Sequence, residues 1–506
     1  MSPTPTRVRV LVIGAGFAGL AVARAMDRAG VRDFLVLERA AAVGGTGRDN
    51  TNPRAACDVP SQLYSYSFAP NPGWSRSYSP QPELQTYLRS VAAESEILDR
   101  VVLRTVVEDV HWDGSSQLWR VQARGPEGTR ELRADVVVSA AGALSDPRIP
   151  SFEGLDRFRG AVFHSARWDH GCDLTGKRVA VIGTGASAVQ VVPEIVERAA
   201  RVDVYQRTAP WVVARRDRTY SAFERAALRR VPGLQSLYRT AIYWTREASV
   251  PAFTRYPGLA RPAERAALRT IEKAIGDPEL RARVTPDFAL GCKRVLLSNT
   301  WYPTLARDDV DLVTEPIDHL TETGIATRDG RHREVDVVVV ATGFHTTDLP
   351  IASRITGRFG TTLAEHFAEH GAQAYKGTTV HGWPNLFLLV GPNTGLGHSS
   401  MVFMIESQVT YVVDALRHLD RAGSTVGSRV AVEPRRSAQA AWVEDVQRRM
   451  TRTVWSRGGC ASWYLDSHGR NVALWPRATF TFRRLLARFD PAAYDVVAPE
   501  RERVEA

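Results

Sequence analysis

One local pattern occurs twice in this chain and limits its fold more than any other feature. The apolar run Val8–Ile13 is too short for a helix, and it leads into GAGFAG at residues 14–19. A stretch with helical spacing ends at Gly30, and a second apolar run, Phe34–Leu37, follows. A strand, a glycine turn, a helix and a parallel strand form the unit that cradles a dinucleotide. The sequence therefore predicts a βαβ unit here.

The same pattern returns in the middle of the chain. An apolar run at residues 178–182 leads into GTGASA at residues 183–188. A helical stretch to Val196 and an expected strand at residues 202–206 follow. Two such units predict an α/β protein with two Rossmann-like dinucleotide-binding domains.

Other segments complete the expected domains. Valine-rich strands at residues 135–138 and 336–340 are each expected to return the chain beneath one of the two nucleotides. The stretch 220–287 is rich in Ala, Arg and Leu and has helical periodicity, which predicts a helical insertion that serves as a substrate lid. The expected boundaries give residues 1–147 and 381–506 to the first domain, 148–219 and 288–380 to the second, and 220–287 to the insertion.

The residues of the first turn have separate expected roles. Gly14 permits the tight turn, Gly16 lets the backbone approach a pyrophosphate, and Gly19 lets the helix pack on the strand. Unpaired N–H groups at the helix start then hold the phosphates. Glu38, at the end of the second strand, is placed to accept hydrogen bonds from both ribose hydroxyls. The alternative is that Glu38 is an ordinary carboxylate at a strand end.

The second site carries a different signature. Ala188 replaces the third glycine, which the motif permits, and the strand end offers Arg207 and Thr208 instead of a carboxylate. A guanidinium can hold a 2′-phosphate with two charge-assisted hydrogen bonds, whereas a carboxylate repels it. We therefore expect this site to prefer NADPH to NADH. The alternative is a solvent-facing Arg207 in an arginine-rich chain.

The composition argues against several classes of protein. The chain has 506 residues, of which 44% are hydrophobic, and this is enough for two or three packed domains. The net charge is +10, but nearly all basic residues are arginines spread along the chain, which argues against nucleic-acid binding. No run of about eighteen apolar residues occurs, so no membrane span is expected. The N-terminus also lacks the apolar core of a signal peptide.

The cysteines lie far apart in the sequence. Cys57, Cys172, Cys292 and Cys460 are each separated by more than 100 residues, so neither a CxxC redox pair nor a zinc site is expected. A reducing cytoplasm fits this pattern best.

A longer motif connects the chain to a known family. Residues 158–169 read FRGAVFHSARWD and match the fingerprint FxGxxxHxxxW[PD], which stands just before the second glycine motif. On this motif the chain resembles the type I Baeyer-Villiger monooxygenases, which belong to the class B flavoprotein monooxygenases. The matching residues are Phe158, Gly160, His164, Trp168 and Asp169.

Further segments support the same resemblance along nearly the whole chain. Residues 44–46 (GGT) and 57–61 (CDVPS) resemble the family segment that passes the flavin ring. Residues 291–294 (GCKR) resemble the segment that carries the active-site arginine. Residues 390–393 (VGPN) and 395–400 (GLGHSS) resemble the turn on the flavin side.

The resemblance implies a mechanism with FAD in the first domain and NADPH in the second. NADPH would reduce FAD, the reduced flavin would capture oxygen as a peroxide, and this peroxide would attack a ketone carbonyl to give an ester or lactone. Arg294 is the expected catalytic cation, because arginine keeps its charge at any relevant pH, and Asp58 is expected to orient it. Lys293 is expected to assist Arg207 at the 2′-phosphate, and His164 to couple the motion of the two units.

Each of these residues also has a simpler interpretation. Taken alone, Asp58 is typical of a turn cap, Lys293 of an exposed lysine, and His164 of a packed or surface histidine. The expected cofactor-binding residues are Gly14, Gly16, Phe17, Gly19, Glu38, Gly45, Thr46, Asp58 and Asn393 for FAD, and Gly183, Thr184, Gly185, Ser187, Ala188, Arg207, Thr208 and Lys293 for NADPH.

The chain also departs from the family pattern. Gly47 stands where members usually carry a tryptophan, and Asn52-Pro53-Arg54 replaces an aromatic-Pro-Gly stretch. Replacing a large aromatic by glycine is expected to widen the wall beside the flavin and to favour a bulky ketone. Residues 455–475 are expected to close over the substrate.

Alternative functions remain open at this stage. The same flavin peroxide can oxygenate sulfur or nitrogen, and a catalytically impaired flavoprotein is another possibility. An NADPH-dependent reductase or disulfide oxidoreductase is disfavoured, because that class needs a cysteine pair beside the flavin, and we expect that none exists in this chain. The expected partners are a small ketone and molecular oxygen, and the expected state is a monomer or homodimer.

Overall fold

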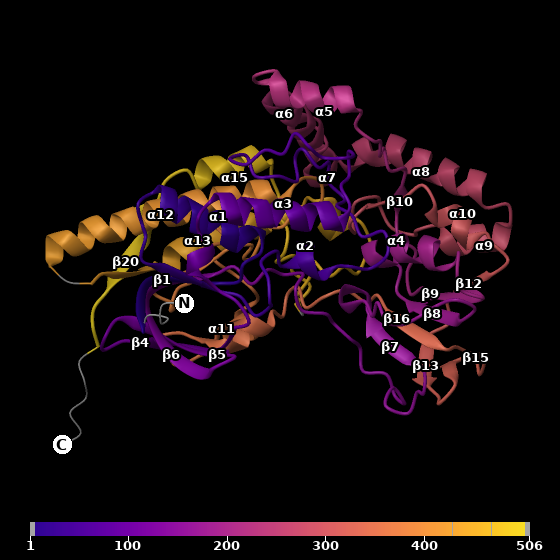
Figure 1. Cartoon of the computed structure of the whole chain (residues 1–506), viewed down its shortest axis with the longest axis horizontal. Coiled ribbons are helices and arrows are strands. Elements are labelled where there is room, and N and C mark those ends of the chain that lie inside the picture. The colour runs from indigo at the N-terminus through magenta and orange to yellow at the C-terminus, as the bar shows by residue number, and fades with distance from the viewer. Residues whose placement is uncertain (1–5, 428, 467, 501–506) are drawn as a thin grey trace.

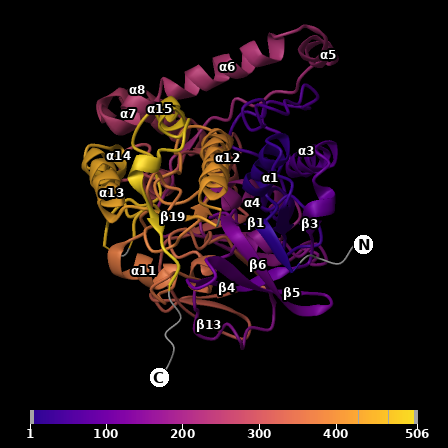
Figure 2. The same ribbon diagram turned by 90° about the vertical axis from the view of Figure 1, so that its left-hand side faces the viewer.

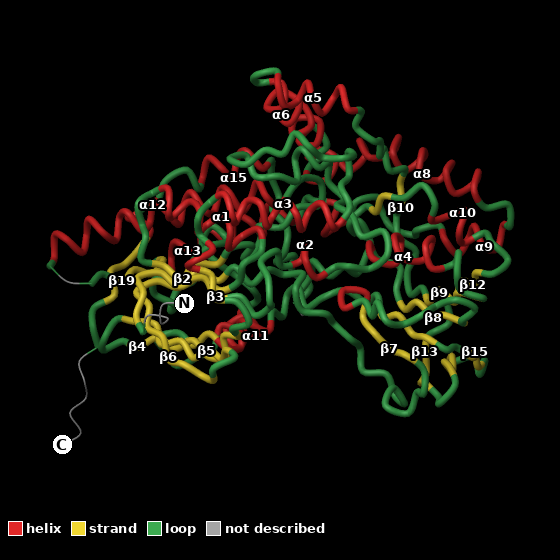
Figure 3. The backbone as a smooth tube through the Cα atoms, viewed as in Figure 1, coloured by secondary structure: helices red, strands yellow, loops and turns green. Residues whose placement is uncertain are grey.

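The computed structural model describes residues 6–427, 429–466 and 468–500 and shows two α/β units side by side (Figure 1). Each unit has its own sheet, and most helices lie above the two sheets in the view of Figure 3. Within the described ranges, no helix combines the length and the apolar character needed to cross a bilayer.

The first sheet is built around the strand that precedes the first glycine turn. The strand β1 (Arg7–Ile13) pairs in parallel with β2 (Phe34–Leu37) and β6 (Gly128–Ser139), with Val12 opposite Val36. Its central residues are fully buried, as expected for a parallel strand covered on both faces. The other strands of this sheet are β3 (Val101–Val102), β4 (Val106–Asp113), β5 (Leu118–Gly125), β17 (Ile355–Thr356) and β18 (Leu386–Leu388).

Two helices form the main cover of this sheet. Helix α1 (Phe17–Arg28) follows the glycine turn, and the long helix α12 (Met401–Val426) lies beside it and shares one apolar core with β1. Figure 2 shows both helices above the sheet. The remaining elements of this unit are α2 (Thr46–Asp49), α3 (Gln81–Glu94), α11 (Leu363–His370), α13 (Arg436–Met450), α14 (Val454–Arg457), α15 (Thr479–Leu485) and the antiparallel pair β19 (Ala431–Pro434) and β20 (Tyr494–Val497).

The second sheet is wholly parallel and confirms the second predicted βαβ unit. The strand β8 (Arg178–Ile182) leads into α4 (Ala186–Ile195) and pairs with β9 (Arg201–Tyr205) and β16 (Val337–Val340). The edge strands are β12 (Val310–Val313) and β7 (Ala161–His164). Smaller elements around this sheet are β10 (Val212–Val213), β11 (Leu296–Leu297), α10 (Trp301–Leu305), β13 (Ile317–Leu320), β14 (Gly324–Thr327) and β15 (His332–Glu334).

The predicted insertion at residues 220–287 is helical. Its helices α5 and α6 lie over the top of the molecule, and α6 crosses above the first unit in Figure 2. A capping box of Ser221 and Glu224 starts the first of them, as the Ser-x-x-Glu spacing dictates. The helices of the insertion are α5 (Ala222–Arg230), α6 (Leu234–Glu247), α7 (Val250–Thr254), α8 (Arg261–Ala274) and α9 (Pro278–Val284).

The chain rejoins the first sheet earlier than the sequence suggested. The short strand β17 pairs with β4, with Ile355 opposite Val110, although residues 288–380 were expected in the second unit. Ile355 and Leu363 of α11 are buried in the apolar core on the lower face of the first sheet. A strand of two residues carries no periodic signal, so sequence alone could not place this return.

Candidate active site

The first glycine turn has no room for a side chain at Gly14 or at Gly19. Gly14 has φ of +101°, and a Cβ there would lie 2.8 Å from a backbone carbonyl oxygen at the end of β6. A Cβ at Gly19 would lie 1.8 Å from the Gly14 carbonyl oxygen, so α1 packs directly on the turn. Gly16 is the N-cap residue of α1 and makes no side-chain hydrogen bond there. The first N–H groups of α1 are therefore available to a phosphate. Phe17 packs its ring on two tyrosines beside the turn.

The segment after β2 closes against this turn. Gly45 has φ of +52°, and a Cβ there would lie 2.9 Å from the Gly16 Cα atom. Thr46 donates from its hydroxyl to a backbone carbonyl at 3.3 Å. A Cβ at Gly47 would meet a methyl group of Leu88 at 3.2 Å. Leu88 therefore lies against Gly47 on the side where a Cβ would project.

Glu38 is buried under the first turn. Its side chain is 4% exposed and accepts hydrogen bonds from the backbone N–H groups of Ala15 (2.8 Å) and Ala40 (2.9 Å). The guanidinium of Arg48 also contacts it at 3.2 Å. A carboxylate offers about four acceptor positions, so one remains for a ribose hydroxyl. Glu38 thus holds the first turn in place through these contacts.

The second glycine turn is more open. Gly183 has φ of +114°, and a Cβ there would lie 2.5 Å from the Ala341 carbonyl oxygen. A Cβ at Gly185, by contrast, would meet nothing within 4 Å. Ala188 is fully buried where the first turn has Gly19, and α4 also begins without a side-chain cap. The hydroxyl of Thr184 reaches the Thr208 carbonyl at 3.3 Å, while Ser187 lies half-exposed in the first turn of the helix.

Two cations, Arg207 just after β9 and Lys293 in the loop before Arg294, lie close enough to influence each other electrostatically. Arg207 is exposed, and Lys293 is half-buried with its ammonium 4.9 Å from the Phe288 ring centroid. Burial lowers the pKa of Lys293, and the positive charge of Arg207 lowers it further. Two like charges held near each other attract an anion between them, which fits the 2′-phosphate of NADPH.

The structure brings Arg294 and Asp58 together from distant parts of the chain. The Arg294 Nε atom donates to an Asp58 carboxylate oxygen at 2.6 Å, and its Nη1 atom donates to the Leu396 carbonyl at 3.2 Å. Burial would raise the pKa of Asp58, but the charge and hydrogen bond of Arg294 outweigh it and hold this pKa below its usual value. The charge of Asp58 in turn raises the pKa of Arg294. Both groups therefore stay charged.

The loop before Arg294 contains a disulfide that the sequence did not reveal. Cys292 is fully buried and is bonded to Cys460, with the Cα atoms 6.1 Å apart. The expectation that the chain has no cysteine pair is therefore wrong. The two residues are separated by 168 positions, and only the fold brings the segment after α14 against this loop. A Cβ at Gly458 would lie 2.7 Å from the Cys292 Cβ, which shows how closely the two segments pack.

Buried polar atoms without partners surround this region. Among the described residues, the Tyr464 hydroxyl, the Ser399 hydroxyl, the His398 Nδ1 atom and the Trp455 Nε1 atom are buried without a hydrogen-bond partner. Burial raises the pKa of Tyr464 to about 12, and the charges of Arg294 and Asp58 act on it as well. Buried polar groups are normally paired, so these atoms indicate a polar ligand. Together with the uncapped start of α1, they fit a flavin dinucleotide.

The turn at residues 390–400 connects to the C-terminal segment. Asn393 has φ of +55°, and its side-chain amide donates to the carbonyls of Asn471 (2.9 Å) and Leu474 (3.1 Å). This expected cofactor ligand thus has a structural role in the described residues. Ser400 caps α12 by accepting from the N–H of Val402 at 3.3 Å.

The fingerprint residues build a corner at the end of β7. His164 is 3% exposed, accepts from the N–H of Ala166 at 3.1 Å, and packs its ring edge on Phe344. Burial lowers the pKa of His164 to about 4, so this side chain is neutral at pH 7. A Cβ at Gly160 would strike the Phe158 ring at 2.5 Å. The remaining contacts of the motif are Trp168 against the Phe163 ring and Asp169 accepting from the N–H of Gly171.

Sequence reasoning missed several residues of the site. Glu247 of α6 is paired with His398, Tyr464 lies beside Arg294, and the Leu396 carbonyl holds the guanidinium. Arg54, at a position that departs from the family pattern, forms an ion pair with Glu194 of α4 and so links the two units. None of these contacts has a short-range sequence signal, because each joins residues far apart in the chain.

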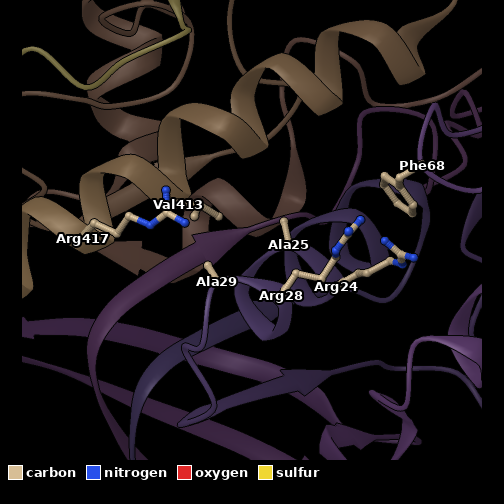
Figure 4. A pocket seen from close by; sticks show the side chains of 7 residues that line it. All are labelled: Arg24, Ala25, Arg28, Ala29, Phe68, Val413 and Arg417. Atoms are coloured by element: carbon tan, nitrogen blue, oxygen red, sulfur yellow. The ribbon is translucent and has the colours of Figure 1, made fainter.

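A hollow on the outer surface lies outside this site. It has a volume of about 240 Å³ and lies between α1 and α12 (Figure 4). Three arginines line it, and the guanidinium of Arg24 stacks on the Phe68 ring at 4.4 Å. Burial and the charge of Arg28 lower the pKa of Arg24. The expected site residues are not among its lining residues, which are Arg24, Ala25, Arg28, Ala29, Phe68, Val413 and Arg417.

Comparison with known proteins agrees with this geometry. The family model of flavin-binding monooxygenase-like proteins matches residues 7–242. A Baeyer-Villiger monooxygenase of Streptomyces coelicolor is 48% identical over 499 residues, which covers 99% of this chain and 94% of the relative. A Baeyer-Villiger monooxygenase of Pseudomonas aeruginosa is 46% identical over 497 residues, covering 97% and 92%.

Solved structures agree as well. A steroid monooxygenase bound to NADP is 30% identical with a TM-score of 0.83, covering 98% of this chain and 100% of that one. A closed structure of cyclohexanone monooxygenase is 26% identical with a TM-score of 0.85 and the same coverage. The OTEMO complex with FAD and NADP is 26% identical with a TM-score of 0.85, covering 97% and 99%. On this full-length similarity, the chain belongs to the Baeyer-Villiger monooxygenase family of flavin-dependent enzymes.

Proposed function

We propose that this enzyme uses FAD, NADPH and molecular oxygen to insert one oxygen atom beside the carbonyl of a ketone. The balanced reaction consumes the ketone, NADPH, a proton and O₂, and yields an ester or lactone, NADP⁺ and water. The observation that carries this proposal is the Arg294–Asp58 pair, held at 2.6 Å among buried polar atoms that lack partners.

The chain's own residues would prepare this chemistry. When bound, FAD carries the electrons from NADPH and activates oxygen. Arg294 supplies a fixed positive charge that stabilises a developing anion, since a guanidinium does not lose its proton. Asp58 orients this guanidinium through its hydrogen bond with the Arg294 Nε atom. The stacked rings of Phe253 and Trp455, whose centroids are 6.5 Å apart, would help to exclude water.

We propose the following binding assignment for the two nucleotides. The first glycine turn, Glu38 and the turn at residues 44–46 would hold FAD, and the second turn with Arg207 and Lys293 would hold NADPH. The two sheets support a division in which the chain leaves the first unit near residue 147, builds the second unit around the helical insertion, and returns at β17. His164 would then lie at the junction of the two units.

The physiological setting is a further part of the proposal. A small ketone is the proposed substrate, and the protein is proposed to act in the cytoplasm as a monomer or homodimer. The need for NADPH supports the cytoplasm as the proposed compartment. The cysteines no longer support it, because the disulfide between Cys292 and Cys460 is of a kind that is uncommon in a reducing compartment.

A product analysis tests the proposal. The FAD-loaded enzyme is given NADPH, ¹⁸O₂ and a panel of ketones, with a thioether offered in the same reaction. We expect an ester or lactone that carries one ¹⁸O atom and is formed faster than the sulfoxide. Preferential sulfoxide formation would instead favour heteroatom oxygenation, and NADPH oxidation that yields only hydrogen peroxide would contradict both.

A further inference from the structure

A buried carboxylate and a buried histidine form a pair next to the Arg294 site. The Nε2 atom of His398 lies 3.1 Å from a carboxylate oxygen of Glu247, and both side chains are only 3% exposed. Glu247 is the buried residue of α6, whose other residues are exposed or half-exposed. Burying a carboxylate costs free energy unless it is well paired, so this arrangement needs a physical reason.

Both oxygen atoms of the Glu247 carboxylate take part in hydrogen bonds. Besides His398, it accepts hydrogen bonds from the Thr479 N–H (2.9 Å) and the Thr479 hydroxyl (2.8 Å). Burial would raise the pKa of Glu247, but these hydrogen bonds outweigh it and lower the pKa. One charged group of the insertion thus fixes both the start of α15 and the side chain of His398.

His398 belongs to the turn that holds Arg294. The Leu396 carbonyl of this turn accepts a hydrogen bond from the Arg294 guanidinium at 3.2 Å, and the turn ends at Ser400, the cap of α12. The ring of Phe253 stacks on the His398 ring with centroids 6.3 Å apart. In the described residues, Arg294 donates to two acceptors, the Asp58 carboxylate and this carbonyl.

We propose that Glu247 is a positioning residue for Arg294, acting through His398 and the turn at residues 396–400. The helical insertion would thereby help to set the orientation of the guanidinium through its Nη1 atom, while Asp58 holds the Nε atom. A hydrogen bond to a buried carboxylate suits this role because it fixes the direction of the histidine ring, whereas apolar packing allows the turn to shift. A shift of about 1 Å at a reacting group can lower a rate by roughly a hundredfold.

This inference rests on the proposed function, and its test needs a readout that does not depend on ketone oxygenation. The full-length, FAD-loaded enzyme is prepared with Glu247→Ala, Glu247→Gln and His398→Ala, and with both alanine changes together. Glu272→Gln is the matched control, because Glu272 is exposed on α8 of the same insertion. The measurements are the absorption spectrum of the oxidised flavin, the hydrogen peroxide released per NADPH consumed, and the KM for NADPH.

We expect Glu247→Ala to alter the flavin spectrum and to raise peroxide release by about tenfold, as misplacement of a site group should. The KM for NADPH should stay within about twofold, since the second glycine turn is not touched. Glu247→Gln should lie between wild type and Glu247→Ala, because it keeps one acceptor for His398. The double variant should be no worse than either single one, as for residues that act as a unit.

Several outcomes would overturn the inference. Lower thermal stability with an unchanged flavin spectrum and unchanged peroxide release would mean that the pair only stabilises the fold. Independent effects of the two alanine changes would mean that Glu247 does not act through His398. If Glu247→Ala fails to fold, the test rests on Glu247→Gln alone. A flavin spectrum and peroxide release that match those of Glu272→Gln would then refute the positioning role of Glu247. A wild type that oxygenates no ketone refutes the proposed function, while changed spectra in the variants would still support the pair.

Discussion

The two glycine turns share one pattern but differ in how tightly they are built. In the first, an added Cβ at Gly19 would lie 1.8 Å from backbone, and the acidic residue at the strand end is 4% exposed. In the second, Ala188 already carries a Cβ at the position that matches Gly19, a Cβ at Gly185 would meet nothing within 4 Å, and Arg207 at the strand end is exposed. The closed turn suits a cofactor that stays bound, and the open turn suits a cosubstrate that binds and leaves in each cycle.

Adding one methyl group to each turn tests this comparison most strongly. Gly19→Ala should abolish FAD retention, because the new methyl group collides with rigid backbone. Gly185→Ala should retain FAD and fold normally, yet weaken NADPH binding roughly tenfold, since overpacking against a ligand costs about 1–3 kcal/mol. FAD content after gel filtration and NADPH titration measure these effects. Equal loss of FAD in both variants would refute the comparison.

Arg294 lies where the two units meet, and its removal should affect chemistry more than binding. Arg294→Ala should lower ester formation by about a hundredfold or more, as loss of a group that stabilises developing charge does. FAD content should stay unchanged. Arg294→Lys should recover little, since an ammonium lacks the planar fork that reaches both Asp58 and the Leu396 carbonyl. Product yield is measured against NADPH consumed, and full yield in Arg294→Ala would disprove the role.

The disulfide should matter for stability. Cys460→Ser should destabilise the fold by about 3 kcal/mol, because the bond closes a long loop in the unfolded chain. Thermal unfolding with and without a reducing agent measures this effect. Cys172→Ser, at a free and half-buried cysteine, is the control. A wild type whose melting temperature does not respond to the reducing agent would show that the bond contributes little.

The open second turn should be sensitive to charge. Arg207→Ala should raise the KM for NADPH roughly tenfold, because a hydrogen bond to a charged group contributes about 1.5–3 kcal/mol, and the KM for NADH should hardly change. Arg328→Ala, an exposed arginine on the second unit, is the control. Equal effects on both nucleotides would mean that Arg207 does not read the 2′-phosphate.

The smallest effect is expected at the ion pair that joins the two units. Arg54 and Glu194 are 56% and 36% exposed, and exposed pairs contribute at most about 1 kcal/mol. Arg54→Ala should therefore change the melting temperature by only a few degrees or less. A larger loss would show that the two units depend on this contact for their relative placement.

The sequence allowed the βαβ units and the helical insertion to be anticipated for local reasons, whereas the pairing of Arg294 with Asp58, 236 positions apart, was expected only from the family resemblance. Each glycine motif is complete within about thirty residues, and helical periodicity needs only a few turns. The contacts that were missed join distant segments, such as Cys292 with Cys460 and Glu247 with His398. Neither β17 nor the buried contacts of Glu38 has a periodic pattern, so only the folded chain reveals them.

The disulfide has a practical consequence for work with the purified protein. Because it joins Cys292 to Cys460, any protease cut between these residues leaves two fragments that remain attached. Such nicked material would migrate as one species on a denaturing gel and separate only after treatment with a thiol. Digestion patterns recorded under the two gel conditions would therefore map which exposed loops between the two cysteines are accessible to cleavage.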